Sequence, residues 1–141
     1  MAFLNSLNIA GSALTAERYK TDVILQNIAN QNVAASTPEE AYQRKQVVFE
    51  ERELSFVDVL NKANGGGVRV ASTEELGEDV NPVYDPDNPR ADEDGYVYYP
   101  NVNNSEEQID LLETTRAYEA NLTALSVVKA MAQKTLEIGK G

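Results

Sequence analysis

The side chains that could carry chemistry in this chain are the carboxylates of one short stretch. Asp85, Asp87, Asp92 and Asp94 fall within residues 85–94, in a region rich in proline and asparagine. Clustered carboxylates can hold a divalent cation, and a suitably spaced pair can act as the acid and base of a glycosidase. The glycosidase hypothesis is disfavoured, because no tryptophan accompanies the carboxylates to bind a sugar.

A calcium site is the more specific of these hypotheses, and the spacing of the residues tests it. When Gly95 is aligned with the glycine of an EF-hand loop, Arg90 falls at the first ligand position and Asn101 at the twelfth. Asp92 and Asp94 fit the pattern, but the glutamate that ends such a loop is missing. A small acidic calcium-binding module therefore stays an alternative to a simpler interpretation, in which the carboxylates keep a turn-rich segment solvated.

Composition excludes most other catalytic sites. The chain of 141 residues has no histidine and no cysteine. It therefore lacks the commonest general base and metal ligand, the thiolate nucleophile and any disulfide. An enzyme of this composition would depend on carboxylates, lysine, tyrosine or serine alone. We expect a protein that is not an enzyme, with no cofactor and no small-molecule substrate.

The charge of the chain is negative and unevenly distributed. The net charge is −11, and residues 74–94, called the acidic loop below, carry nine acidic residues against one basic residue, a net −8. The rest of the chain therefore carries only −3. Since proteins that bind nucleic acid present basic surfaces, we expect no nucleic-acid partner.

An amphipathic helix is expected from Phe3 to about Ile28. Apolar residues recur there at alternating spacings of four and three, and Arg18 and Thr21 interrupt the row. Small residues around Gly11 would let another backbone come close. We expect the segment not to be a cleavable signal peptide, because it lacks a basic beginning and its apolar residues are interrupted by polar ones. No apolar run is long enough to span a membrane.

A longer helix is expected from Ser105 to Ile138. It begins with SEEQ, a capping box with two acids at the positive end of the helix, and Gly139 is a natural stop. Two rows with strict four-three spacing run along it. The first flank comprises Leu111, Thr115, Tyr118, Leu122, Leu125, Lys129, Ala132 and Leu136, and the second comprises Ala117, Ala120, Ala124, Val127, Met131, Lys134 and Ile138.

Two apolar flanks on one helix imply more than one neighbour. A helix that packs against a single partner needs one stripe about 100° wide. The N-terminal helix of the same chain supplies one neighbour, and we expect another chain to supply the second. A free monomer could not cover both flanks, so we expect its terminal helices to be largely disordered until assembly.

The middle of the chain is expected to be strand and turn. Strand-forming residues lie at 42–51, 68–72 and 95–100, residues 55–64 favour a short helix, and residues 65–67 are a run of glycine. Residues 81–101 hold four of the five prolines and are expected to be extended and turn-rich.

The fold class that follows is α+β. The expected parts are residues 1–32 as an N-terminal helix, residues 33–104 as a small β-rich middle region that includes the acidic loop, and residues 105–141 as a C-terminal helix. The two helices are expected to pack as a coiled-coil-like hairpin, antiparallel or nearly parallel.

The quoted segments resemble a known family. GSALTAERYKTDVILQNIANQN is similar to the N-terminal signature of the bacterial flagellar rod and hook axial proteins, which leads into an N-I-A-N motif. YQRKQVVFEE, PVYDPDNPRADEDGYVYYPNV and TTRAYEANLTALSVVKAMAQKTLEIGKG closely resemble one rod component of that family. Val33 departs from the pattern, because the family usually has threonine there.

The resemblance suggests a role for the asparagines at the end of the first helix. In the family, the N-I-A-N segment ends this helix and starts the crossover into the β region. Asn27, Asn30 and Asn32 could then bond to the backbone of this chain or of a neighbour, with no charge to desolvate. Surface charges would be costly inside a packed rod.

The function implied by the resemblance is structural. Copies would assemble helically in the proximal rod of the flagellar basal body, around the export channel, and transmit motor torque. Implied partners are further copies of the chain, other rod proteins, the rod-ring adaptor and the membrane ring. The residues expected at the assembly interface are Leu4, Leu7, Gly11, Leu14, Leu25, Asn27, Ile28, Asn30, Asn32, Leu111, Tyr118, Leu122, Leu125, Val127, Met131 and Leu136.

The implied location is the basal body in the cell envelope, which is periplasmic in a Gram-negative bacterium. The resemblance also implies type III export with the N-terminal region kept. A distal rod or hook subunit is the alternative within the family, but such subunits usually carry an inserted outer domain. A chain of 141 residues leaves no room for one.

Overall fold

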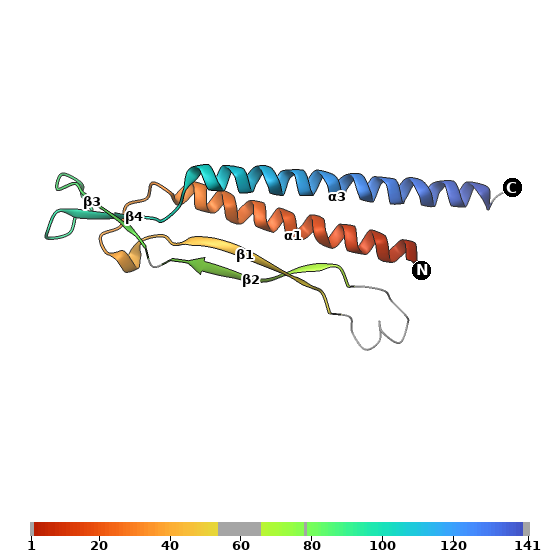
Figure 1. Cartoon of the computed structure of the whole chain (residues 1–141), viewed down its shortest axis with the longest axis horizontal. Coiled ribbons are helices and arrows are strands. Elements are labelled where there is room, and N and C mark those ends of the chain that lie inside the picture. The colour runs from red at the N-terminus through yellow and green to blue at the C-terminus, as the bar shows by residue number, and fades with distance from the viewer. Residues whose placement is uncertain (1, 54–65, 78, 140–141) are drawn as a thin grey trace.

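Two long helices and two β-hairpins make up the fold (Figure 1). The structure, a computed structural model, describes residues 2–53, 66–77 and 79–139. In chain order the elements are α1 (Ala2–Asn30), the short 3-10 helix η1 (Pro38–Glu40), β1 (Arg44–Glu51), β2 (Val68–Leu76), β3 (Asn81–Tyr84), β4 (Tyr96–Tyr99) and α3 (Asn104–Ile138). The expected α+β class is confirmed. The helix expected over residues 55–64 lies outside the described residues.

Helix α1 is the middle layer of the molecule (Figure 1). It packs against α3 on one side and against the β1–β2 hairpin on the other. The two chain termini lie at the same end, so α1 and α3 form an antiparallel pair, and the β3–β4 hairpin lies at the opposite end. Since α3 forms an outer layer, most of its circumference has no neighbour within the chain.

The face of α1 that turns inward is built from small and β-branched residues. Ala10 and Ala16 are buried toward its N-terminal half, and Val23 and Ile24 toward its C-terminal half. The helix ends at Asn30, slightly beyond the expected end near Ile28. Its last turn closes with a hydrogen bond from the Val33 amide to the Asn30 carbonyl at 3.0 Å.

The N-terminus of α3 differs from the expected capping box. The cap residue is Asn103, whose side-chain oxygen accepts a hydrogen bond from the Ser105 amide at 3.0 Å. The helix therefore begins at Asn104, because asparagine is as good a cap as serine and stands earlier in the chain. The expected end at Ile138 is confirmed, although Gly139 has φ −74° and is not left-handed.

The β1–β2 hairpin is antiparallel and lies along α1. Its register pairs Val48 with Ser72 and Phe49 with Val70, which leaves Ala71 as the extra residue of a bulge. The strand expected around 68–72 is confirmed, and it continues to Leu76. The hairpin is held to α1 by polar contacts as well as by packing. The Val68 amide donates to Ser12 Oγ at 3.0 Å, and the hydroxyls of Tyr19 and Thr73 lie 3.1 Å apart.

The β3–β4 hairpin corrects the expectation for the acidic loop. Residues 81–101 are expected to be extended and turn-rich and to end in a single strand; the structure adds a second strand, because Asn81–Tyr84 pairs with Tyr96–Tyr99 along its whole length. This strand is difficult to predict from the sequence, because it contains Pro82 and proline is disfavoured in the middle of a sheet. β3 is an edge strand, where the missing N–H costs nothing. The hairpin joins the rest of the chain through two backbone hydrogen bonds between Ala35 and Tyr98 and through a hydrogen bond from Arg90 Nη1 to the Ala34 carbonyl.

Asp92 organises the connection between β3 and β4. Its carboxylate accepts hydrogen bonds from the Tyr96 amide at 2.7 Å, the Asp94 amide at 3.0 Å and the Tyr98 hydroxyl at 3.1 Å. Gly95 has φ +83°, a conformation that favours glycine, and a Cβ there would lie 3.0 Å from the Tyr84 ring. Tyr84 in turn meets Tyr96 edge to face.

Little of the chain is buried. The accessible surface is 9810 Å², whereas a compact monomer of 15.5 kDa is expected to expose roughly 7200 Å². The buried apolar side chains of the described residues are mostly small: Ala10, Ala16, Val23, Ile24, Ala35, Ala41 and Val97. The core is therefore a narrow line along α1 with a small extension into the β3–β4 hairpin.

The bonds to Asp92 predict how the β3–β4 hairpin responds to acid. The hydrogen bond from the Tyr96 amide, helped by those from Tyr98 and Asp94, lowers the pKa of Asp92. The carboxylate therefore stabilises the hairpin fully above about pH 3.9, the ordinary value for aspartate. This stabilisation is lost as the pH falls through the lower folded-state pKa. We expect the Tyr96 and Asp94 amide NMR signals to shift together in that range, and Asp92→Asn to abolish the transition. A transition above the ordinary aspartate value would contradict this.

Candidate assembly interface

A buried polar cluster joins three elements where α1 ends and α3 begins. Asn27 is fully buried, and its amide uses all four of its hydrogen-bonding positions. Its nitrogen donates to the Lys45 carbonyl and to Glu107 Oε2, each at 2.9 Å. Its oxygen accepts from the Lys45 amide at 3.0 Å and from the Tyr42 hydroxyl at 2.8 Å. One side chain of α1 thus forms hydrogen bonds with both β1 and α3.

Arg44 completes the cluster from β1. Its Nε donates to the other oxygen of Glu107, and its terminal nitrogen donates to Asp110 Oδ2 at 3.0 Å. Glu107 is fully buried, so its charge must be compensated inside the protein. The Arg44 guanidinium and the Asn27 amide between them occupy both carboxylate oxygens. We call this cluster the polar hub; it comprises Asn27, Tyr42, Arg44, Glu107, Asp110 and the backbone of Lys45.

The hub changes the acid–base properties of two members. Burial alone would lower the pKa of Arg44, but the hydrogen bond and charge of Glu107, with the charge of Asp110, raise it. Burial raises the pKa of the Tyr42 hydroxyl, and the charges of Glu107 and Glu75 add to that effect. Arg44 therefore stays charged and Tyr42 stays a neutral donor through the physiological range. Among the described residues, no buried side-chain nitrogen or oxygen lacks a hydrogen-bond partner.

The asparagines expected at the assembly interface separate into different roles. Asn27 takes the first of the two roles suggested above, because it is buried and bonds to the backbone of its own chain, and in the single chain it presents no surface to a neighbour. Asn30 is half-buried and donates to the Gln26 carbonyl of its own helix at 2.7 Å. Asn32 is exposed beyond the helix end.

The face of α3 that meets α1 lies between the two expected flanks. Glu107 and Thr114 are its buried residues, and Asn121 and Val128 follow at seven-residue intervals and are half-buried. Residues seven apart lie on nearly the same side of a helix. Sequence periodicity missed this face, because three of its four members are polar and the search followed apolar residues.

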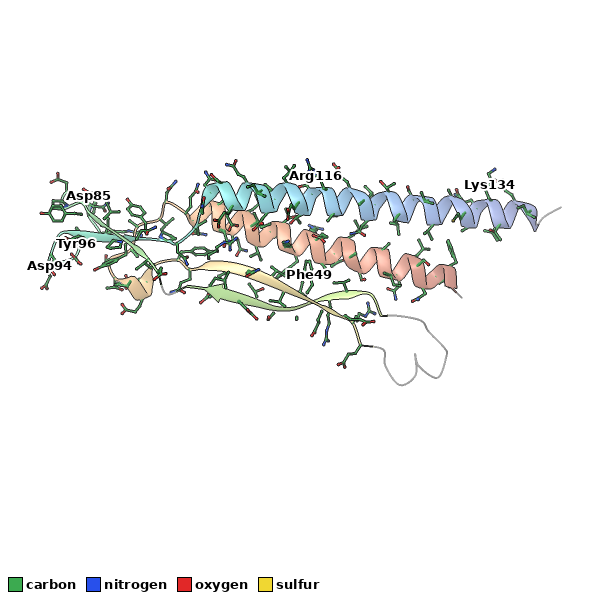
Figure 2. The ribbon with its side chains drawn as sticks, viewed as in Figure 1. Phe49, Asp85, Asp94, Tyr96, Arg116 and Lys134 are labelled. Carbon is green, nitrogen blue, oxygen red and sulfur yellow. The ribbon has the colours of Figure 1, made fainter. Side chains whose placement is uncertain are left out.

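Both flanks of α3 are consequently left largely open. The first flank exposes 38% of Tyr118, 48% of Leu122 and 68% of Leu136, while Leu111 and Leu125 are half-buried at its inner edge. The second flank exposes 49% of Val127 and 65% of Met131. Arg116 and Lys134 point away from α1 on the outer side of the helix (Figure 2). Large apolar side chains open to solvent on one helix are typical of an interaction surface.

Helix α1 also keeps an open face, which carries several of its expected interface residues. Leu4 is 63% exposed and Leu25 is 48% exposed. Leu7, Gly11, Leu14 and Ile28 are half-buried. A Cβ built at Gly11 would meet nothing within 4 Å, so its small size is not used for packing within the chain.

The acidic loop does not form a metal centre in the described residues. No group of three or more acidic side chains there is arranged to hold a metal ion. The Asp92 carboxylate is occupied by two backbone amides and a tyrosine hydroxyl. Asp85, Asp94 and Tyr96 lie at the end of the molecule opposite the termini (Figure 2). The described helices include none with the length and apolar character needed to cross a membrane.

The polar hub predicts which asparagine of the N-I-A-N motif the fold depends on. Asn27→Ala leaves Glu107, Tyr42 and the Lys45 backbone short of partners, and each buried unpaired group costs about 1–3 kcal/mol. We expect amide hydrogen exchange at residues 23–30 and 104–114 of the monomer to accelerate by roughly a hundredfold. The matched control is Asn30→Ala, which removes a single bond on the same helix turn and should change exchange little. Equal effects of the two substitutions would contradict the assignment.

Comparison with known proteins gives consistent matches along the whole chain. The family model described as "Flagellar basal body rod FlgEFG protein C-terminal" matches residues 93–138, which include β4 and the whole of α3. The chain is 41% identical over 150 residues to the flagellar basal-body rod protein FlgC of Bacillus subtilis. It is 40% identical over 140 residues to the FlgC of Salmonella typhimurium. In both cases 99% of this chain and 100% of the relative are covered.

A third relative gives the same result. The FlgC of Borreliella burgdorferi is 38% identical over 152 residues, and the match covers both chains completely. The flagellar resemblance drawn from the sequence motifs is thereby confirmed, and the calcium-binding alternative is not favoured. With identities of this size over its full length, and with paired terminal helices around a small β-rich middle, the chain belongs to the FlgC family of flagellar basal-body rod proteins.

Proposed function

We propose that this chain is a non-enzymatic subunit of the proximal rod, which assembles helically with other rod proteins into the shaft that transmits motor torque. The observation that carries the proposal is the open apolar surface of α3. Val127 and Met131 on one flank and Leu122 and Leu136 on the other remain 48% to 68% exposed in the single chain. A helical assembly supplies a neighbour for each flank, because heterologous contacts repeat without closing.

The division of the chain follows from this role. Residues 1–32 and 105–141 form the axial core, and residues 33–104 form the part that lies farther out and contacts neighbouring subunits. The polar hub supports the division, because it fixes the β1–β2 hairpin to the base of the helix pair. A torque-bearing subunit gains from such a joint, since a bonded polar cluster permits fewer relative orientations than apolar packing alone.

The proposed partners are the other rod proteins, the rod-ring adaptor and the membrane ring, together with further copies of the chain. The proposed location is the basal body, which is periplasmic in a Gram-negative cell, reached by type III export without cleavage of a signal peptide. The family membership supports these proposals, and so does the N-terminal helix, which packs along its length into the folded subunit.

A substitution on the second flank of α3 tests the assembly role. Met131→Glu places a charge on a side chain that is 65% exposed in the monomer, so the fold should survive while docking fails. We expect loss of swimming when this variant replaces the rod protein of a flagellated bacterium. The matched control is Ala130→Glu, which adds the same charge at an exposed position one residue away, about 100° around the helix and outside both flanks. Equal loss in both variants would refute a role specific to the flank.

The same surface predicts that the isolated subunit is incompletely folded. With both flanks of α3 uncovered, we expect dilute monomer to show less helix by far-UV circular dichroism than the 29 and 35 residues of α1 and α3. Residual helix should be concentrated at the hub, where the buried contacts are. Full helix content in the monomer, unchanged on assembly, would show that the flanks need no partner.

A further inference from the structure

The end of the β3–β4 hairpin is a surface that the described parts of the chain leave largely open. Every residue of β3 is exposed, so both faces of this strand are accessible. Val83 is 44% exposed, Tyr84 is 64% exposed, and Tyr96, which pairs with Tyr84 across the hairpin, is 41% exposed. The hairpin lies at the end of the molecule opposite the chain termini (Figure 1). Exposed tyrosine beside exposed aliphatic side chains is typical of protein interfaces.

Acidic side chains accompany these apolar residues (Figure 2). Residues 81–99 carry five acidic residues against one basic residue, a net −4. Asp87, Glu93 and Asp94 are exposed, and their carboxylates form no ion pair or hydrogen bond with any residue that the structure describes. The one cation, Arg90, donates a hydrogen bond to the Ala34 carbonyl. The residues called the hairpin surface below are Val83, Tyr84, Tyr96, Asp87, Glu93 and Asp94.

The hairpin surface is held in one shape within the single chain. The Asp92 carboxylate accepts hydrogen bonds from two backbone amides and from the Tyr98 hydroxyl, which fixes the connection between the two strands. The rings of Tyr84 and Tyr96 meet edge to face, with their centres 5.3 Å apart. Because these groups are already ordered, a partner that binds here has little conformational entropy to remove.

The hairpin of a second copy is a poor partner for this surface. Tyr98, the residue opposite Pro82, uses its N–H and its carbonyl to bond Ala35, so the nitrogen of Pro82 faces the open edge of β3. That edge therefore lacks an N–H at this position, and proline on an edge strand hinders pairing with another strand. Two hairpin surfaces would also repel each other, because both are acidic.

The cations of a second copy do not form a matching surface either. Arg44 and Lys45 are the only adjacent cations in the chain. Arg44 is paired with Glu107 and Asp110. Lys45 is paired with Glu75 at 3.9 Å. Since each copy carries −11 in total, charge complementarity favours a protein of different sequence as the partner.

We propose that the hairpin surface docks a protein other than this chain, on a region of that protein where lysine or arginine side chains border an apolar patch. The tyrosines and Val83 then supply the apolar centre of the contact, and the three carboxylates pair with the partner's cations at its rim. This inference rests on the proposed function, and it assigns one contact of the assembled subunit to one surface and to one class of partner.

Charge reversal on the hairpin surface tests the proposal. In the bacterium that encodes this chain, the double variant Asp87→Lys with Glu93→Lys should abolish or strongly reduce swimming, because like charges then face each other across the contact. The matched control is Glu51→Lys with Glu53→Lys, which makes the same change of net charge at exposed positions outside the hairpin. Normal swimming of the first variant, or equal loss in both, overturns the proposal.

A folding defect would give the same loss of swimming, so two further measurements exclude it. The amide NMR signals of Tyr96 and Asp94, which report the bonds to Asp92, should be unchanged in the purified double variant. Asp87→Asn with Glu93→Gln keeps the size of both side chains and should reduce swimming in part. Normal swimming of this neutral variant overturns the proposed charge pairing.

Photo-crosslinking identifies the partner. The photoreactive residue benzoylphenylalanine is placed at Val83, the cells are illuminated, and crosslinked peptides from isolated basal bodies are sequenced by mass spectrometry. A crosslink to a different protein, at a segment that contains lysine or arginine, is expected. Changing those cations to glutamate should then restore swimming to the Asp87→Lys, Glu93→Lys variant. A crosslink to a second copy of this chain, a crosslink to a segment without cations, or no crosslink overturns the proposal.

The outcomes separate this inference from the proposed function. If cells that lack the chain swim normally, the proposed function fails. If loss of the chain and Met131→Glu each abolish swimming while the Asp87→Lys, Glu93→Lys variant swims normally, the proposed function stands and the contact at the hairpin surface is wrong.

Discussion

The structure depends on one buried carboxylate and the groups that neutralise it. Glu107 is fully enclosed near the start of α3, and it is held by a guanidinium from β1 and an amide from α1. An isolated charge in such a place would be prohibitively costly, so the three elements must meet in one arrangement or not at all. The remaining contacts of the helix pair are mostly apolar and only partly buried, and apolar contacts are not directional. The hub therefore sets the register, and the narrow apolar core follows it.

Most of helix α3 lacks such specific contacts. Its contacts with the hub lie near one end, and the rest of the long helix packs only shallowly on α1. A globular protein would have folded another element over this surface. In the proposed assembly, the same apolar side chains hold neighbouring subunits together, and the assembled state is then the stable one.

Sequence periodicity predicted both long helices and the strands that became β1, β2 and β4, because each has a clear apolar rhythm or a run of strand formers. It missed β3, where Pro82 contradicts the usual signal and only the edge position makes the residue acceptable. It located the two flanks of α3 but not the face between them, which is built on Thr114 and Asn121. The spacing of polar residues along a sequence does not show whether the helix face that they form is buried or exposed to solvent.

The hub could be predicted only in part. The N-I-A-N motif drew attention to the asparagines, yet nothing local distinguishes Asn27 from Asn30. The difference arises from partners 15 to 80 positions away in the chain. Glu107 appeared in the sequence as an ordinary acid in the first turn of a helix. Its burial depends on Arg44, which is 63 positions earlier. Such relations are properties of the folded arrangement, and a single sequence does not reveal them.

The distance along the chain between the members of the hub has a kinetic consequence. Asn27 cannot complete its hydrogen bonds until a residue 80 positions later is available. During synthesis, which begins at the N-terminus, α1 therefore waits for nearly the whole polypeptide before it gains its main stabilising contacts. Contacts between such remote segments slow folding, because a long loop must close before any of them forms. Folding of the nascent polypeptide is therefore delayed. The chain stays unfolded, and able to pass through a narrow channel, for longer than a helical protein of this size otherwise would.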